Sequence, residues 1–290
     1  IDDAERAAKF DLEGSGLFRT EFLFLDRADA PSLEEQTETY TKVLQAFGDR
    51  RVVVRTLDAG ADKPLSFADL GKEENPALGR RGLRLCQARE DLIDTQLAAL
   101  AAAYEATKAD LWVMAPMVST LEEAQWFADK ARGVGLPKVG IMIEVPAAAI
   151  RADQMLSIVD FASIGTNDLT QYTMAADRMD GELAPLLNAW QPAVLQMIKF
   201  ACEGGRSTGK SIGVCGEAGG DPLLALVLTG LGVGSLSMAP TKVNAVRAAL
   251  RLHDLATCQQ MAAYALDAPT AEEGRNNVLK LVSPTMLALL

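Results

Sequence analysis

Seven short apolar segments alternate with longer amphipathic stretches, and this rhythm constrains the fold more than any other feature of the chain. Continuous apolar runs of this length predict strands buried on both faces, as in a parallel sheet covered by helices. The alternation predicts an α/β fold, either a closed barrel or an open doubly wound sheet. The predicted strands are residues 17–25, 51–57, 111–117, 138–145, 158–165, 211–215 and 235–239.

Two of the intervening stretches begin with a helix-start pattern. SLEEQTETYTKVLQAF and STLEEAQWFADKAR both open with Ser-x-x-Glu, the capping-box spacing. The chain itself opens with a helical pattern, DDAERAAKF, and the residues after 253 are helical in pattern as well. Because a barrel of this class has eight strands and begins with one, we expect the first strand to be missing from this chain and to lie upstream. No linker or repeat divides the sequence, which predicts one domain over 1–290.

Composition excludes several classes of protein. The net charge is -11 and no basic cluster is present, which argues against nucleic acid and anionic membranes as partners. The longest apolar run, near LLALVLTGLGVG, is too short to span a bilayer, and no secretory signal pattern opens the chain. The cysteines are widely spaced and form no CxxC pair, which argues against zinc and disulfides and favours a reducing cytoplasm. They are Cys86, Cys202, Cys215 and Cys258.

Polar groups follow the fifth predicted strand in the stretch SIGTNDLTQYTMAADR. This stretch holds an amide, Asn167, a carboxylate, Asp168, and an arginine, Arg178. A second carboxylate, Glu144, ends the preceding strand. Strand-end loops build phosphate and metal sites in α/β barrels, and two carboxylates there can hold a hard divalent cation. For this loop alone, a turn capped by Asn and Asp is the competing interpretation.

Arg19 and Arg55 lie inside predicted strands or at their ends, and Arg81 lies in a loop or helix start after a glycine in NPALGRRGLR. Guanidinium groups make bidentate, charge-assisted bonds to phosphate and carboxylate, so a convergent set favours an anion site. The alternative pairs each arginine with one of the 39 acidic residues. The loop DAGADKP at 58–64 adds Lys63, for which a solvated turn is the alternative.

Cys215 ends a predicted strand in VCGEAGGDP, where glycines permit close approach of the backbone to a ligand. A cysteine in that position can act as a nucleophile or a general acid, although spacing alone favours a buried structural thiol. The other three cysteines lie in helical patterns and are interpreted as structural. The single histidine, His253, is interpreted as structural too.

Six motifs resemble the C-terminal phosphoenolpyruvate-binding domain of enzyme I of the bacterial phosphotransferase system. They extend from residue 16 to about residue 240, and a weaker similarity to pyruvate phosphate dikinase and phosphoenolpyruvate synthase is expected. In chain order, the motifs are RTEFLFLDR, VVVRTLDAGADKP, KEENPALGRRGLR, IEVPAAA, SIGTNDLTQYTMAADR and VCGEAGGDP.

The resemblance implies a (β/α)8 TIM barrel that binds phosphoenolpyruvate and Mg²⁺ at the carboxyl ends of its strands. It assigns proton donation to the enolate carbon, giving pyruvate, to Cys215. An ordinary thiol, with a pKa of about 8.5, is a competent donor near neutral pH. Lys63 matches a family position with a supporting electrostatic role. The implied ligands are Glu144 and Asp168 for Mg²⁺, Arg19, Arg55, Arg81 and Arg178 for the phosphate and carboxylate, and Asn167 for the phosphate.

The resemblance also implies partners. The family's acceptor is a histidine on a separate N-terminal domain, which passes the phosphoryl group to the histidine-containing carrier protein of sugar transport. Nothing in this chain resembles that domain, and His253 cannot replace it because it follows all the motifs. We therefore expect a barrel that binds ligand but does not turn over alone. The resemblance also implies a homodimer, because the barrel domain is the dimer-forming part of the family, and the cysteine pattern favours the cytoplasm. The alternatives are a dikinase or synthase fragment, a dimerisation and regulatory module, and a Mg²⁺-dependent aldolase or lyase with no role for Cys215.

Overall fold

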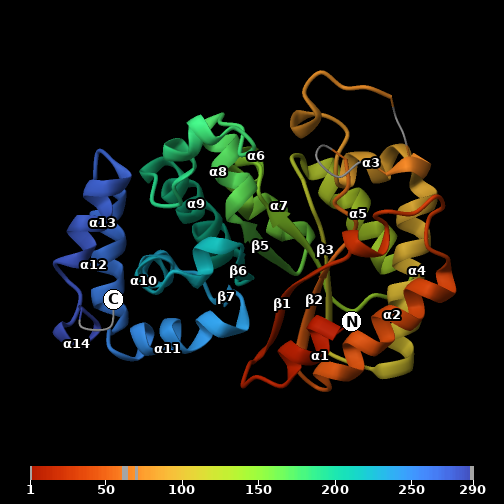
Figure 1. Ribbon diagram of the computed structural model, residues 1–290, viewed down its shortest axis with the longest axis horizontal. Helices are drawn as coiled ribbons and strands as arrows, with labels where there is room; N and C mark the ends of the chain where they lie inside the picture. The colour runs from red at the N-terminus through yellow and green to blue at the C-terminus, as the bar shows by residue number, and fades with distance from the viewer. Residues whose placement is uncertain (1, 61–64, 69–70, 288–290) are drawn as a thin grey trace. The chain divides into compact units, whose positions relative to one another are not determined.

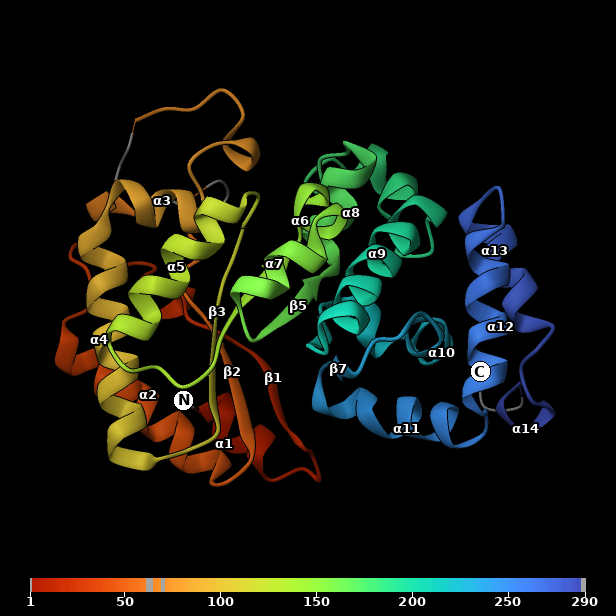
Figure 2. The ribbon, with the colours of Figure 1, turned by 180° about the vertical axis from the view of Figure 1, so that it is seen from behind.

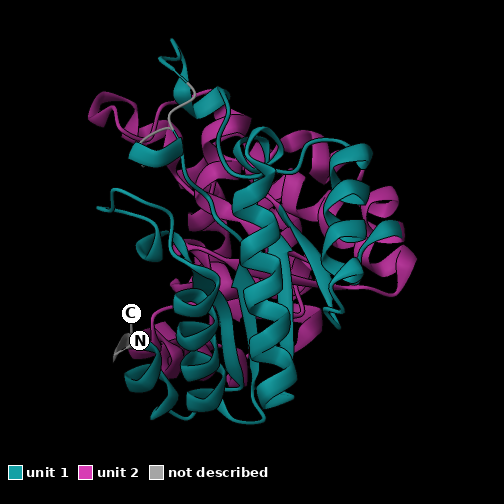
Figure 3. Cartoon of the chain, turned by 90° about the vertical axis from the view of Figure 1, so that its right-hand side faces the viewer, with its two compact units in different colours: residues 1–142, 158–160 teal, residues 143–157, 161–290 magenta. Residues whose placement is uncertain are grey.

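The computed structural model of the chain describes residues 2–60, 65–68 and 71–287. The chain divides into two compact units, coloured separately in Figure 3. Unit 1 comprises residues 1–142 and 158–160, and unit 2 comprises residues 143–157 and 161–290. The single domain over 1–290 that the sequence predicts stays a prediction.

All seven predicted strands are present, and their order in the sheet is the order of the chain. Every strand pair that the structure describes is parallel. This sequential parallel order, with helices between strands, is that of the TIM barrel, so the α/β prediction is confirmed, and seven strands fit a barrel without its first strand. The strands are β1 (Gly14–Arg19), β2 (Arg51–Arg55), β3 (Leu111–Ala115), β4 (Val139–Ile143), β5 (Phe161–Gly165), β6 (Ser211–Cys215) and β7 (Ser235–Ser237).

The first strand is shorter at its end than the sequence predicts. β1 stops at Arg19, and the predicted continuation to residue 25 forms the short 3-10 helix η1 (Glu21–Leu23) instead. The carboxylate of Glu21 accepts hydrogen bonds from the Arg55 side chain and from the backbone N–H of Asp58. These bonds hold the chain in a turn where an apolar pattern alone predicts extended backbone.

In unit 1, helices cover the strands, and the central residues of β2 and β3 are mostly buried, whereas those of β1 are partly exposed. The helices α2 and α4 lie side by side in both ribbon views (Figure 1, Figure 2). The apolar side chains of β2, Val52 to Val54, are at most 7% exposed beneath them. The helices of unit 1 are α1 (Asp2–Ala8), α2 (Leu33–Phe47), α3 (Leu83–Ala88), α4 (Glu90–Thr107) and α5 (Leu121–Gly133).

One predicted capping box is confirmed and the other lies one residue further on. Ser32 caps α2, with its hydroxyl and the Glu35 carboxylate each accepting a backbone N–H of the other residue. At α5 the cap is Thr120, paired with Glu123, so the prediction that Ser119 starts the helix is wrong. The Ser119 backbone N–H also donates to Glu123. Both Ser-x-x-Glu and Thr-x-x-Glu fit the sequence here, and the spacing cannot choose between them.

Unit 2 is mostly helical around β5, β6 and β7. Its apolar stretch PLLALVLTGL forms α10, which packs against α11 and α12 and is buried on most of its surface. None of the described residues forms a helix long and apolar enough to cross a membrane. The helices are α6 (Pro146–Ile150), α7 (Ala152–Ile158), α8 (Thr166–Met174), α9 (Pro192–Thr208), α10 (Pro222–Leu231), α11 (Val243–Arg251), α12 (Leu255–Leu266), α13 (Ala271–Leu279) and α14 (Pro284–Leu287).

His253 forms hydrogen bonds that join α11 to the start of α14. Its Nε2 accepts the backbone N–H of Ser283, 3.0 Å away, so its Nδ1 carries the proton shared with the carbonyl oxygen of Ala249 at 2.8 Å. Both ring nitrogens are therefore used in joining the end of α11 to the start of α14. This supports the structural interpretation of the histidine.

Candidate functional site

In unit 2, strand pairing brings Cys215 beside the polar loop that the sequence singles out. Cys215 ends β6 and pairs in register with Gly165, the last residue of β5. Thr166 begins α8 directly after Gly165, so Asn167 and Asp168 lie in the first turn of that helix. The Cys215 side chain is 2% exposed and Asp168 is 6% exposed, whereas Asn167 is exposed. A carboxylate in a first turn is favoured by the partial positive charge of the helix start.

The start of α8 has an unusual polar environment. Gly165, its N-cap residue, offers no capping side chain. The Thr166 hydroxyl is buried and finds no hydrogen-bond partner among the described residues. Gly216, with φ of +143°, lies against it so closely that a Cβ would stand 2.5 Å from Thr166 Oγ1 and 3.3 Å from Thr166 N. An uncapped helix start presents backbone N–H groups that bind anions, and a glycine keeps the approach open.

Arg178 returns to the same helix start. After α8 the chain turns at Ala175, which has φ of +50°. The Arg178 backbone N–H then donates to Gln171 Oε1 at 2.9 Å, and its Nη1 lies 3.6 Å from Asp168 Oδ2. The Arg178 side chain is 29% exposed. Four predicted site residues, Asn167, Asp168, Arg178 and Cys215, therefore lie on neighbouring parts of unit 2.

The carboxylates of Glu144 and Asp168 fit a magnesium site by their chemistry. Glu144 directly follows β4 and is fully buried, and Asp168 follows β5. Mg²⁺ prefers oxygen ligands and is typically held by one or two carboxylates together with waters and substrate phosphates. Among the described residues, no group of three or more His, Cys, Asp or Glu side chains could hold a metal ion. The fit is therefore to an ion that shares its coordination with ligand and water.

In unit 1, two predicted ligands are buried in a four-residue ion-pair cluster. Arg55 Nη2 lies 2.7 Å from Glu21 Oε1, and Arg55 Nη1 lies 3.0 Å from Asp58 Oδ2. Arg81 Nη2 lies 3.2 and 3.0 Å from the two oxygens of Asp58. Each of the four side chains is at most 6% exposed. The alternative that these arginines pair with acidic residues is thus realised for Arg55 and Arg81.

Arg19 and Lys63 are the other two predicted cationic site residues in the sequence of unit 1. Arg19 is exposed at the end of β1, and its side chain makes no hydrogen bond or ion pair with any residue that the structure describes. Lys63 lies outside the described residues. Arg19, Arg55 and Arg81 nevertheless all lie at or after the carboxyl ends of β1 and β2.

Sequence reasoning missed the two carboxylates of the cluster. Glu21 and Asp58 each follow a strand that ends in arginine, in RTEF and RTLD. The strand-end argument that selected Asp168 applies to both and could have found them. Gln96, a third buried polar residue behind the cluster, gives no such signal because it lies within the helix α4.

The three remaining cysteines are structural, as the sequence predicts. Cys86 lies in α3, Cys202 in α9 and Cys258 in α12, and all are buried. Burial raises the pKa of the Cys86 and Cys202 thiols to about 12 and that of Cys258 above its ordinary value. A thiol with so high a pKa stays protonated and unreactive at neutral pH.

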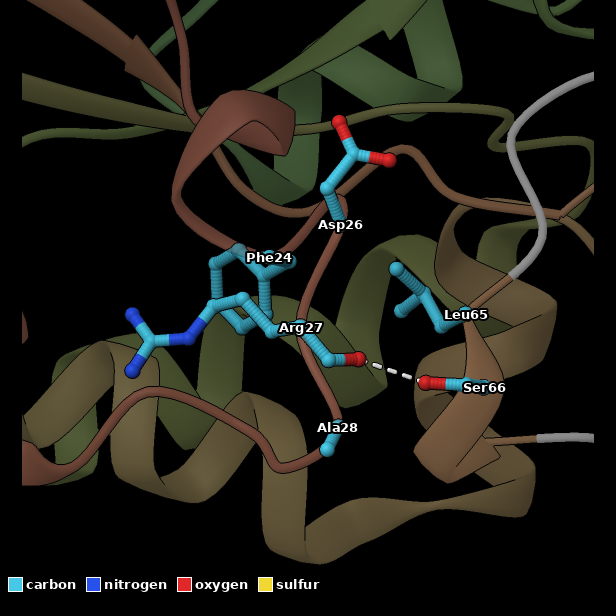
Figure 4. Close-up of a pocket in the computed structure, with 6 residues that line it drawn as sticks. All are labelled: Phe24, Asp26, Arg27, Ala28, Leu65 and Ser66. Atoms are coloured by element: carbon cyan, nitrogen blue, oxygen red, sulfur yellow. Dashed lines mark hydrogen bonds between the residues drawn. The ribbon is translucent and has the colours of Figure 1, made fainter.

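A cavity of about 510 Å³ lies elsewhere in unit 1 (Figure 4). Among its described lining residues the one cation is Arg27, whose side chain makes two hydrogen bonds to Glu35 and whose carbonyl oxygen accepts the Ser66 hydroxyl. The bond from Arg27 lowers the pKa of the Glu35 carboxyl. None of the described lining residues is a predicted site residue, and Arg27 is already paired with a carboxylate. The lining residues are Phe24, Asp26, Arg27, Ala28, Leu65 and Ser66.

Comparison with known proteins identifies the family. Residues 1–255 match the model of the PEP-binding domain of PEP-utilising enzymes. The chain belongs to this family. The resemblance seen in the motifs is therefore confirmed.

Several phosphotransferases resemble the whole chain. The phosphoenolpyruvate-protein phosphotransferase of Streptomyces coelicolor is 53% identical over 283 residues, which cover 97% of this chain and 51% of that protein. The protein of the same name from Haloferax volcanii is 46% identical over 274 residues, covering 90% of this chain and 48% of that protein. The chain thus spans about half the length of these curated relatives.

One solved structure supports the fold alone. A malate synthase from Haloferax volcanii, in a complex with pyruvate and acetyl-CoA, aligns with a TM-score of 0.53 at 14% identity. The alignment covers 84% of this chain and 64% of that one. Similarity at this level concerns architecture and carries no activity to this chain.

Proposed function

We propose that this chain binds phosphoenolpyruvate with Mg²⁺ and supports transfer of its phosphoryl group to a histidine, with release of pyruvate. The observation that carries the proposal is the pairing of Cys215 with Gly165. This pairing sets a thiol beside the helix start that holds Asn167 and Asp168, with Arg178 next to Asp168. A phosphoenolpyruvate enzyme needs an anion site, a cation ligand and a proton donor, and these residues supply all three.

The start of α8 is suited to a phosphate or carboxylate. Its unshared N–H groups, the Asn167 amide and the Arg178 guanidinium all favour negative charge. The contact between Arg178 Nη1 and Asp168 Oδ2, at 3.6 Å, is longer than a hydrogen bond, and the Arg178 side chain is 29% exposed. We therefore assign orientation of the phosphoryl donor to these residues.

Glu144 and Asp168 are the proposed magnesium ligands. When bound there, Mg²⁺ would neutralise charge on the phosphate and on the developing enolate. Arg178 adjoins the same carboxylate and supplies a fixed positive charge from the protein itself. Substitution of either carboxylate should therefore weaken phosphoenolpyruvate binding chiefly when magnesium is present.

Cys215 is the proposed proton donor. When the bridging P–O bond breaks, the phosphoryl group passes to the acceptor nitrogen and the electron pair forms the enolate of pyruvate. The thiol proton of Cys215 then forms the new C–H bond at the methylene carbon, and the thiolate regains a proton from water. The donor must be a protonated thiol, which agrees with a side chain that is only 2% exposed.

Arg19, Arg55 and Arg81 are proposed anion ligands of phosphoenolpyruvate. Arg55 and Arg81 are held rigidly by Glu21 and Asp58, so their donors are fixed in direction before ligand arrives. Arg19 is exposed and adds a charge that no carboxylate in the described residues neutralises. These residues contribute positive charge and orientation, and no proton transfer is assigned to them.

Partners follow from the proposed reaction. The acceptor is a histidine of a separate N-terminal domain, and from there the phosphoryl group passes to the histidine-containing carrier protein of the sugar phosphotransferase system. A homodimer in the cytoplasm is part of the same proposal. The names of the relatives favour this function over a dikinase or synthase fragment. They also favour it over a purely regulatory module or an aldolase.

Calorimetry of the 290-residue chain with phosphoenolpyruvate, with and without Mg²⁺, tests the binding. We expect magnesium-dependent heat that Asp168→Asn largely abolishes and that the exposed control Asp153→Asn leaves unchanged. Absence of heat under every condition would overturn the proposal.

The acceptor is tested with the same chain and labelled phosphoenolpyruvate. Without a phosphohistidine domain, we expect no stable phosphoprotein, and addition of that domain should give labelled histidine and pyruvate. Stable labelling of the chain alone would contradict this part. Cleavage of a C–C bond would instead favour the aldolase or lyase.

A further inference from the structure

A fully buried glutamine on α4 uses both of its amide protons and its carbonyl oxygen in hydrogen bonds. The Gln96 side chain is 0% exposed. Its Oε1 accepts the backbone N–H of Leu57 at 2.8 Å, and its Nε2 donates to Thr20 Oγ1 at 3.1 Å and Tyr40 Oη at 2.9 Å. Burial of a polar amide is costly unless it is bonded, so these bonds hold three separate segments of unit 1 to one helix.

The direction of every bond in this network is fixed. The Thr20 hydroxyl donates its single proton to the carbonyl oxygen of Arg55, at 3.0 Å. The Tyr40 hydroxyl donates to Gln36 Oε1, also at 3.0 Å. Both hydroxyls must therefore accept from Gln96, which forces its carbonyl oxygen toward Leu57. Only a side chain with two donors and one acceptor in this arrangement satisfies all the partners.

The network contacts the residue that precedes each carboxylate of the ion-pair cluster. Thr20 precedes Glu21, and Leu57 precedes Asp58. Glu21 and Asp58 in turn bind Arg55, and Asp58 also binds Arg81. Gln96 thus holds the residues directly before Glu21 and Asp58, and these two carboxylates hold Arg55 and Arg81.

We propose that Gln96 is a positioning residue that sets the direction of the Arg55 and Arg81 guanidinium groups. It does so by holding the loops after β1 and β2 in fixed register, through Thr20 and Leu57. The effect of Gln96 on phosphoenolpyruvate binding rests on the proposed function, whereas its effect on the direction of the two arginine side chains does not.

Gln96→Leu tests the proposal against Gln36→Leu. Gln36 is a second buried glutamine of the same network, but it lies at the far end, bonded to Tyr40 and to the carbonyl oxygen of Pro31. Both substitutions remove a buried amide at nearly constant volume. Only Gln96→Leu removes the contacts with Thr20 and Leu57, so the two variants separate a positioning role from a general stabilising one.

Two measurements on the arginine cluster need no ligand. Exchange of the Leu57 amide proton should rise at least about tenfold in Gln96→Leu, because its acceptor is gone. The NMR signal of the Arg81 Nε–H, which donates to Asp58, should shift or broaden in Gln96→Leu and stay in place in Gln36→Leu. An unchanged Arg81 signal in a folded Gln96→Leu variant would overturn the proposal.

Affinity for phosphoenolpyruvate gives the functional readout. Gln96→Leu should raise the Kd about fivefold or more, and Gln36→Leu should change it less than twofold. If the unaltered chain binds no phosphoenolpyruvate, the proposed function fails, and the Arg81 signal still decides the role of Gln96. If Gln96→Leu does not fold, Thr20→Val removes one arm of the network, and the same shift of Arg81 is expected. A Thr20→Val variant with an unchanged Arg81 signal would also overturn the proposal.

Discussion

The two units hold their charged residues in opposite ways. In unit 1, Arg55 and Arg81 are buried with Glu21 and Asp58, and the paired atoms lie 2.7 to 3.2 Å apart. In unit 2, Arg178 is partly exposed and stands 3.6 Å from Asp168. Unit 1 therefore surrounds Arg55 and Arg81 closely with carboxylates, whereas unit 2 leaves Arg178 partly exposed to solvent.

Because of this difference, we expect substitutions in unit 1 to affect mainly folding stability and substitutions at Arg178 in unit 2 to affect mainly ligand binding. Removal of one partner from a buried ion pair leaves a charge without compensation, which costs about 3–5 kcal/mol. Loss of a partly exposed pair costs at most about 1 kcal/mol. Substitutions in the cluster of unit 1 should therefore act first on folding, and substitutions at Arg178 should act first on the ligand.

The largest expected effect is that of Asp58→Asn. It weakens the bonds of two buried arginines at once, so the free energy of unfolding should fall by about 3–5 kcal/mol. Urea denaturation measures this. The control is Asp91→Asn, which breaks an exposed pair with Arg89 and should cost at most about 1 kcal/mol. Equal losses in the two variants would remove the distinction between buried and exposed pairs.

Gly216→Ala should destabilise unit 2, because Gly216 has a positive φ and the added methyl group would clash with Thr166. The φ of +143° and a Cβ only 2.5 Å from Thr166 Oγ1 predict a loss of about 1–3 kcal/mol in unfolding free energy, together with weaker phosphoenolpyruvate binding. Gly209→Ala is the matched control, since it has φ of +67° but no atom within 4 Å of its Cβ. If Gly209→Ala reduced binding equally, close approach at the start of α8 would have no role.

Arg178→Ala should separate binding from folding. The Kd for phosphoenolpyruvate should rise roughly tenfold or more, because one charge-assisted contact is lost. The free energy of unfolding should change by less than about 1 kcal/mol, because the pair with Asp168 is long and partly exposed. Calorimetry and urea denaturation on one preparation test both statements. A large loss of stability with unchanged affinity would show that Arg178 acts on folding and not on ligand binding, which contradicts the proposed difference between the units.

The smallest expected effect appears at alkaline pH, where the two units should respond alike. Cys86 in unit 1 and Cys202 in unit 2 have pKa values raised by burial from 9.0 to about 12. Because the folded state holds these thiols protonated, their contribution to stability is complete below pH 9 and is lost as the pH rises toward 12.

Urea denaturation at pH 8 and pH 10 checks this. At pH 10 each thiol should have lost about 1.4 kcal/mol of its contribution. Cys86→Val and Cys202→Val should each remove part of that dependence. A pH dependence unchanged in both variants would contradict the assignment.

The sequence predicts the strands, and the residues that unit 2 brings together, better than the ion-pair cluster of unit 1. Apolar runs locate all seven strands, and the order of parallel strands brings Cys215 beside the loop of Asn167 and Asp168. The turn at Glu21 escapes the pattern because a long-range bond to Arg55 overrides local preference.

The partners of Arg55 and Arg81 could not be chosen from sequence, since many acidic residues are available to each arginine. Gln96 is less predictable still. A polar residue inside a helix is usually exposed, and only the packing of α2, α4 and the strand ends buries this one.

The most direct test of the account is amide NMR mapping of phosphoenolpyruvate binding in the presence of Mg²⁺. We predict shifts at Thr166, Asn167, Asp168 and Gly216, with none around Leu65 and Ser66 of the cavity in unit 1. Omission of Mg²⁺ should weaken the shifts at the start of α8. Shifts confined to that cavity, with the start of α8 unchanged, would contradict the account.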